Sequence, residues 1–99
     1  MEYRELEQLV IKWADEKGIF EKGNTMAQAE KTHEEVLELM SAIDNDDNGE
    51  IVDALGDILV TIIIQAEMQG LSLEDCLLSA YNVISKRKGK MINGKFVKE

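Results

Sequence analysis

The sequence contains no proline and few aromatic residues, and Cys76 is its only cysteine. A lone cysteine excludes a disulfide within the chain. Aromatic residues at 5% and the absence of proline favour helices over a β-sandwich or a barrel. The longest apolar run, Ile58–Ile64, is too short to span a bilayer, and no signal peptide is visible at the start. We therefore expect a soluble, cytoplasmic protein.

The charge of the chain is strongly negative and unevenly distributed. The 99 residues suit one domain, residues 1–99, with a formal net charge of -9. Such a charge repels nucleic acid and anionic membranes, and we expect neither as a partner. No lysine or arginine lies between Lys31 and Lys86, whereas acidic residues fill much of that stretch. The centre is therefore expected to meet cations, and the basic flanks an anion.

Hydrophobic spacing and capping residues predict two helices in the first half of the chain. The first runs from about Tyr3 to Lys17 and stops at Gly18. A loop leads to Asn24 or Thr25, either of which can cap a second helix of roughly twenty residues. The second helix is expected to bury an apolar stripe and to carry a polar stripe on its opposite side. The apolar stripe comprises Ala29, Val36, Met40 and Ile43, and the polar stripe comprises Gln28, Lys31, Glu35 and Glu38.

The pattern in the second half of the sequence predicts two more helices and a short hairpin. The third helix, from about Glu50 to Gln69, becomes apolar on nearly every side. A helix that is apolar all round must be covered all round, so we expect a subunit interface here. Ser72 opens a fourth helix that ends at Gly89, and Asn93-Gly94 is typical of a hairpin turn. We expect an all-α four-helix bundle with a short C-terminal hairpin or extended tail, assembled as a dimer or tetramer through the third helix.

Acidic residues form one stripe on each of the two middle helices. Like charges at these spacings destabilise a helix unless something neutralises them. The short connection makes the two helices antiparallel neighbours, so the stripes can face each other. Carboxylates with no thiolate or imidazole among them suit a hard divalent cation, Mg²⁺ or Mn²⁺. The first stripe comprises Glu34, Glu35 and Glu38, and the second comprises Glu50, Asp53 and Asp57.

Other interpretations compete with a magnesium site. The two stripes can be solvated acidic faces that bind no ligand. A di-iron site requires Glu-x-x-His pairs, and His33 is the only histidine. A calcium-binding EF-hand loop that begins at Asp44 requires a glutamate at its last position, where this chain has Leu55. A turn rich in Asp, Asn and Gly explains the same segment without calcium. The magnesium site and the solvated face remain.

The acidic pattern resembles that of the MazG-like all-α nucleoside triphosphate pyrophosphohydrolases: Glu34-Glu35-x-x-Glu38 precedes Glu50-x-x-Asp53-x-x-x-Asp57, which opens an aliphatic helix. The resemblance to short, phage-type members of this family extends over nearly the whole chain. It comprises Trp13 with Lys17-Gly18, Gln28-x-x-Lys31, Tyr81-Asn82 with Lys86-Arg87-Lys88-Gly89, and the tail from Asn93 to Lys98. One departure is Ala54, which stands three residues before Asp57. Because Glu50 and Asp53 complete the motif one turn earlier, either Asp53 or Asp57 is the principal ligand.

The resemblance implies a Mg²⁺-dependent enzyme, with Mn²⁺ as a substitute, that cleaves an NTP or dNTP between the α- and β-phosphates. The products are the nucleoside monophosphate and pyrophosphate. Metal bound by the acidic stripes would lower the pKa of a bound water, and Glu35 or Glu38 would accept its proton. Cationic side chains suit the triphosphate tail, and an amide can read a base edge. The candidate substrate-binding residues are Gln28, Lys31, Asn82, Lys86, Arg87, Lys88 and Trp13, with core packing as the alternative for Trp13.

A second hypothesis belongs to a different class of function. The chain can instead be a non-catalytic acidic helical oligomer or adaptor that keeps the fold without turnover. The two hypotheses differ in one measurement, the release of pyrophosphate from a panel of NTPs and dNTPs with and without Mg²⁺. The sequence specifies neither the base nor the sugar of the nucleotide.

Overall fold

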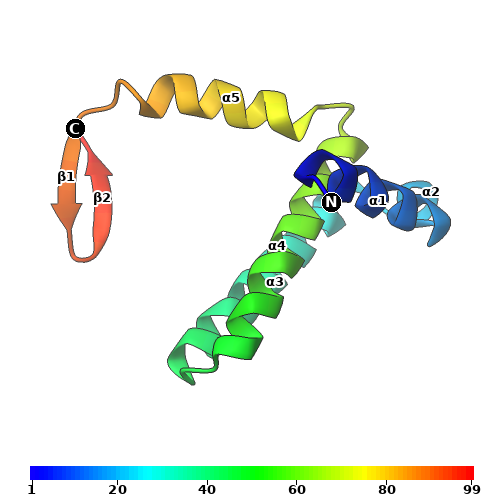
Figure 1. Cartoon of the computed structure of the whole chain (residues 1–99), viewed down its shortest axis with the longest axis horizontal. Coiled ribbons are helices and arrows are strands. Elements are labelled where there is room, and N and C mark those ends of the chain that lie inside the picture. Colours follow the sequence, from blue (N-terminus) through cyan, green and yellow to red (C-terminus); the bar gives the residue numbers. More distant parts are fainter.

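The computed structural model describes all residues, 1–99, and contains five helices and one hairpin (Figure 1). The helices are α1 (Tyr3–Glu16), α2 (Ile19–Lys22), α3 (Thr25–Asp44), α4 (Asn48–Met68) and α5 (Leu73–Ile84). The strands are β1 (Gly89–Ile92) and β2 (Lys95–Lys98). None of these helices combines the length and the hydrophobicity that a membrane-spanning segment needs.

The four predicted helices are present, and side-chain caps fix three of their starts. The fourth ends at Ile84 and not at Gly89 as predicted, because Gly89 begins β1. Asn24 accepts a hydrogen bond from the Ala27 amide at 2.8 Å, at the start of α3. Asp47 and Ser72 cap α4 and α5 in the same way. One additional helix, α2, lies where a loop was expected. It forms because Gly18, with a φ of 77°, ends α1 and lets the chain turn at once into one further helical turn.

The core lies between the antiparallel helices α3 and α4, with α1 packed against α4. Ile63 and Ile64 of α4 are buried, as are the small residues Ala42 of α3 and Ala54 of α4. Small residues at a helix contact let the two backbones approach closely. A polar contact joins the same pair, because the Gln28 side-chain amide donates to the Thr61 carbonyl at 3.0 Å. The α3–α4 pair is therefore the best-packed part of the chain.

The face of α3 that meets α4 is not the apolar stripe that the sequence predicted. The buried residues of α3 are Gln28, Glu35 and Ala42, which lie two turns apart along the polar side. Met40 and Ile43 of the expected stripe are 60% and 58% exposed. Hydrogen bonding of Gln28 to α4 and the small side chain of Ala54 allow the polar side to pack inward. The prediction is wrong for a single chain, and an apolar face of α3 is left open.

Helix α5 and the hairpin extend away from the α3–α4 pair (Figure 1). The chain turns at Gly70, whose φ is 68°, and no residue of α5 is buried. The strands pair in register from Gly89 with Lys98 to Ile92 with Lys95. Asn93 and Gly94 both have positive φ, as the predicted two-residue turn requires. A closed four-helix bundle, which the sequence predicted, is therefore not formed within one chain.

Candidate metal centre

Three carboxylates come together on the facing sides of α3 and α4. Glu35 and Glu38 are one turn apart on α3, and Asp57 lies opposite them on α4. One oxygen from each of the three lies within 4.8 Å of the others. We call these residues the acidic cluster. The antiparallel pairing of the two helices is what brings residues so far apart in sequence to one place.

Glu35 is the buried member of the acidic cluster, with 7% of its surface exposed. Its Oε1 lies 3.4 Å from the Lys31 Nζ, whereas its Oε2 is buried without any hydrogen-bond partner. A buried polar atom without a partner is unfavourable, and for an ionised carboxylate the cost rises. A divalent cation would supply the missing partner, and Glu38 and Asp57 offer the oxygen ligands that Mg²⁺ prefers. The residues of this cluster therefore fit a metal.

The proximity of Glu35 affects the protonation of Glu38. A proton on Glu38 would be shared with Glu35 in a hydrogen bond, and this bond, together with the negative charge of Glu35, raises the pKa of Glu38 above its usual range. Hydrogen bonds to Glu35 and Glu34 likewise raise the pKa of Lys31, which stays charged. A proton on Glu38 and the ammonium group of Lys31 are thus the two ways in which this chain itself offsets the negative charge.

The other three predicted acidic ligands lie around the cluster and not in it. Glu34 is exposed and forms an ion pair with Lys31 at 3.4 Å. Glu50 lines a shallow groove of about 370 Å³, near the turn between α3 and α4, to which Glu38 also contributes. Asp53 is exposed on α4. The structure thus distinguishes Asp57 from Asp53 by position, because only Asp57 joins Glu35 and Glu38.

The predicted substrate-binding residues are distributed over the whole molecule. Gln28 is buried between α3 and α4, where its amide bonds to Thr61, and Lys31 lies beside the acidic cluster. Trp13 is half exposed on α1. The remaining four, Asn82, Lys86, Arg87 and Lys88, are exposed at the end of α5 and just beyond it. The basic residues at the end of α5 and the acidic cluster are therefore not brought together within one chain.

One buried polar group was not identified from the sequence. Thr61 interrupts the aliphatic run of α4, and its hydroxyl accepts from the Thr32 hydroxyl at 2.9 Å and donates to the Ile58 carbonyl. Together with Gln28, these groups form a buried polar contact one turn from Asp57. The signal in the sequence was the single polar residue within Ile58–Ile64.

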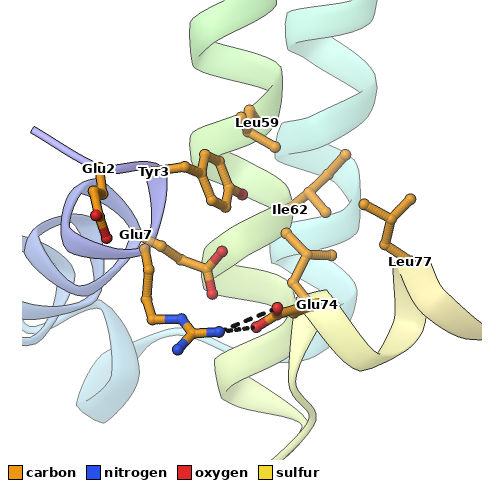
Figure 2. Close-up of a pocket in the computed structure, with 9 residues that line it drawn as sticks. Glu2, Tyr3, Glu7, Leu59, Ile62, Glu74 and Leu77 are labelled. Atoms are coloured by element: carbon orange, nitrogen blue, oxygen red, sulfur yellow. Dashed lines mark hydrogen bonds and ion pairs between the residues drawn. The ribbon is translucent and has the colours of Figure 1, made fainter.

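A second concave surface lies where α1, α4 and α5 meet, with a volume of about 730 Å³. Figure 2 shows Tyr3, Leu59, Ile62 and Leu77 converging on it, with Glu2, Glu7 and Glu74 around them. Arg4 donates two hydrogen bonds to Glu74, at 3.0 and 3.2 Å. Burial and a hydrogen bond with Glu7 raise the pKa of Tyr3. Its lining combines apolar residues with charged ones, and none of the acidic cluster lines it, so this surface is separate from the candidate metal centre.

Comparison with protein-family models matches residues 24–92 to a MazG nucleotide pyrophosphohydrolase domain. The match covers more than half of the chain and runs from the start of α3 to the end of β1. It includes every residue of the acidic cluster. Neither the curated proteins nor the solved structures give a match to this chain.

Proposed function

The chain belongs to the family of MazG nucleotide pyrophosphohydrolase domains, and on that premise we propose that it hydrolyses a nucleoside triphosphate between the α- and β-phosphates. The products are a nucleoside monophosphate and pyrophosphate. One observation carries the proposal: the acidic cluster, with its buried and unpartnered Glu35 oxygen, lies within the matched domain. An acidic surface that served only solubility would not bury such an oxygen.

Mg²⁺, or Mn²⁺ in its place, is the proposed cofactor, with Glu35, Glu38 and Asp57 as its first ligands. Glu50 is placed to add a ligand because it shares a groove with Glu38, and Glu34 and Asp53 are the outlying candidates. A divalent cation bound there would neutralise phosphate charge and lower the pKa of a bound water. The carboxylates themselves set where that cation sits, and burial holds Glu35 in place.

The protein's own groups account for the remaining parts of the reaction. The carboxylate of Glu38 is exposed, and we assign to it the acceptance of a proton from the attacking water. The oxygen of that water bonds to the α-phosphorus, the bond from the α-phosphorus to the bridging oxygen breaks, and pyrophosphate leaves with that oxygen. The Lys31 Nζ, which lies 3.4 Å from a carboxylate oxygen of both Glu34 and Glu35, pairs with Glu35 and keeps it oriented.

Self-assembly is the second part of the proposal. Val52, Leu55 and Leu59 form an apolar stripe along α4, which we call the α4 stripe, and all three are at least 40% exposed. Exposed apolar surface of this kind marks an interaction site. We therefore propose a homo-oligomer that is assembled through α4.

The experiment that tests the activity is pyrophosphate release from a panel of NTPs and dNTPs, with Mg²⁺, with Mn²⁺ and with a chelator. Glu38→Gln should lower kcat by about a hundredfold or more, on the scale of lost electrostatic stabilisation. Glu30→Gln is the matched control, because Glu30 is an exposed glutamate of α3 outside the acidic cluster. Turnover unaffected by the chelator and by Glu38→Gln would contradict the metal-centred proposal. A chain that releases no pyrophosphate from any nucleotide would be the non-catalytic oligomer instead.

A further inference from the structure

We infer that Thr32 and Thr61, together with Gln28, hold α3 and α4 in the register that the acidic cluster needs, and that this register favours Mg²⁺ over Ca²⁺. None of the three residues belongs to the acidic cluster, so they are positioning residues. Their role rests on the proposed function and deepens it, because the register decides how far apart the metal ligands lie.

The hydrogen bonds that join α3 to α4 follow one line along the contact between the helices. The Thr32 hydroxyl donates to the Thr61 hydroxyl at 2.9 Å. The Gln28 side-chain amide donates to the Thr61 carbonyl at 3.0 Å. One turn further along α4, the Gln65 side-chain amide donates to the Thr25 carbonyl at 3.2 Å. We call these five residues the polar seam.

The acidic cluster continues the line of the polar seam by one further turn. On α4, Asp57 lies four residues before Thr61, and on α3, Glu35 lies three residues after Thr32. Residues three or four apart are neighbours on one face of a helix. The Thr61 hydroxyl also donates to the Ile58 carbonyl at 2.7 Å, which ties the seam to the turn of α4 that carries Asp57. The separation of the Glu35 and Asp57 carboxylates therefore depends on the register that the seam holds.

The polar seam is better suited than apolar packing to fix this register. The buried residues of α3 are Gln28, Glu35 and Ala42, and none of them is a large apolar side chain. Apolar burial has no preferred direction, whereas the donor–acceptor distance of a hydrogen bond varies by only about 0.5 Å. Thr61 is 5% exposed, so water has little access to replace a lost partner. A slip of one residue, about 1.5 Å along the helix, would break both of the contacts that α3 makes to Thr61.

Mg²⁺ is more sensitive to such a slip than Ca²⁺. It requires near-octahedral ligands at about 2.0–2.1 Å, whereas Ca²⁺ accepts oxygens at about 2.3–2.6 Å in a flexible geometry. In the observed register, one oxygen from each member of the acidic cluster lies within 4.8 Å of the others. A shift of about 1.5 Å is a large part of that span, so a loosened register should reduce Mg²⁺ affinity first.

The test measures the binding of metal ions alone to the full chain, without nucleotide. Thr61→Val removes the hydroxyl and keeps a branched side chain of similar size, whereas Thr61→Ser keeps the hydroxyl. Electron paramagnetic resonance measures bound Mn²⁺, and its displacement by Mg²⁺ or Ca²⁺ gives a Kd for each. Thr61→Val should raise the Mg²⁺ Kd by about tenfold, the lower end of the range for groups that orient metal ligands. The Ca²⁺ Kd should rise clearly less, and Thr61→Ser should stay near the wild type in both.

A second variant and a matched control separate register from stability. Thr32→Val removes the same hydrogen bond from the α3 side, where Thr32 is only half-buried, and it serves if Thr61→Val does not fold. Because the two substitutions share one bond, their effects on the Mg²⁺ Kd should not add in the double variant. Ile64→Val is the control, because it removes a buried methylene and lowers stability without changing the polar seam.

A measurement in chelator reports the register without metal or turnover. Nuclear Overhauser effects from the Gln28 side-chain amide to residue 61 should weaken in both Val variants, while their circular dichroism stays helical. Unchanged Overhauser effects, an unchanged Mg²⁺ Kd in both variants, or equal losses for Mg²⁺ and Ca²⁺ would overturn the inference. The same loss of Mg²⁺ affinity in Ile64→Val, or a wild type that binds no metal, would also overturn it. A wild type that shows the expected changes but releases no pyrophosphate would contradict the proposed function alone.

Discussion

The α3–α4 pair and the segment formed by α5 and the hairpin both have clear capping and turn residues in the sequence. They differ in burial, because the first is packed and the second is exposed. Asn24, Asp47 and Ser72 cap their helices in the same way, and Asn93-Gly94 forms the expected turn. Yet most of the buried residues belong to α3 and α4, and none belongs to α5 or to either strand. Caps and turns thus define an element whether or not it has a packing partner. Burial separates the part of the chain that is packed in this structure from the part that is left exposed.

The same two regions differ in charge, and this difference bears on function. The α3–α4 pair concentrates carboxylates around a buried glutamate, while residues 85–99 concentrate lysine and arginine. A metal-bound nucleotide needs both kinds of side chain. Its phosphates bind cationic groups, and the divalent metal binds carboxylate oxygens. In the proposed reaction these two tasks would fall to different parts of the chain.

The largest expected effect separates the two regions by stability. Ile64→Ala should lower the free energy of unfolding by about 2–5 kcal/mol, because Ile64 is 3% exposed in the core. Leu78→Ala should change it far less in dilute protein, because Leu78 is 57% exposed in one chain. Urea unfolding of both variants at low concentration measures the difference. Equal losses would show that α5 packs against its own chain.

The next effect concerns the choice between Asp57 and Asp53. Asp57→Asn should lower kcat by about a hundredfold, or about 2.7 kcal/mol, because it removes a carboxylate from the acidic cluster. Asp53→Asn should have a smaller effect, because Asp53 is exposed and outside the cluster. Both are measured at saturating Mg²⁺. A larger loss for Asp53→Asn would move the metal toward Glu50 and the turn between the helices.

A third prediction concerns pH and applies to the metal-free protein in chelator. Because the pKa of Glu38 is raised on folding, the native state holds this proton at a pH where the unfolded state has lost it. Stability should therefore fall as the pH rises from about 4.5 through the raised pKa. Glu38→Gln should flatten this part of the profile and raise the melting temperature at pH 7.

Addition of metal should neutralise the negative charge of the acidic cluster and so stabilise the folded protein. A cation that binds only the folded state at about a hundred times its Kd adds about 2.7 kcal/mol of stability at neutral pH. Thermal melts from pH 4 to 8, with and without Mg²⁺, compare the wild type with Glu38→Gln. A pH profile that is identical in both proteins would show that the Glu35–Glu38 interaction is not what destabilises the metal-free form.

Much of the fold followed from sequence because its signals are local. The spacing of Glu35 and Glu38 on one helix placed them on one face, and the short connection made α4 antiparallel to α3. The register between the two helices was not available from spacing, which is why Asp57 and Asp53 stayed equivalent until the packing was known. The four residues of α2 are too few for a hydrophobic period to be recognised.

The face of α3 is the most informative difference between prediction and structure. Hydrophobic periodicity identifies an apolar stripe but not the partner that covers it. Here Gln28 and Glu35 pack against α4, while Met40 and Ile43 stay exposed. The prediction for α3 requires that its apolar stripe packs within the same chain. In a protein that self-assembles, the apolar stripe can serve another copy, and the sequence of one chain does not distinguish the two cases.

The smallest expected effect tests how firmly α5 is held by its own chain. Arg4 of α1 and Glu74 of α5 form the ion pair that joins the two helices, but their side chains are 75% and 67% exposed. Exposed pairs contribute about 0.2–1 kcal/mol, and less in salt. A double-mutant cycle with Arg4→Ala and Glu74→Ala should give a coupling in that range, with Lys12 and Glu16 within α1 as the matched pair. Coupling well above 1 kcal/mol that persists in 1 M salt would mean that α1 fixes the direction of α5 within the chain.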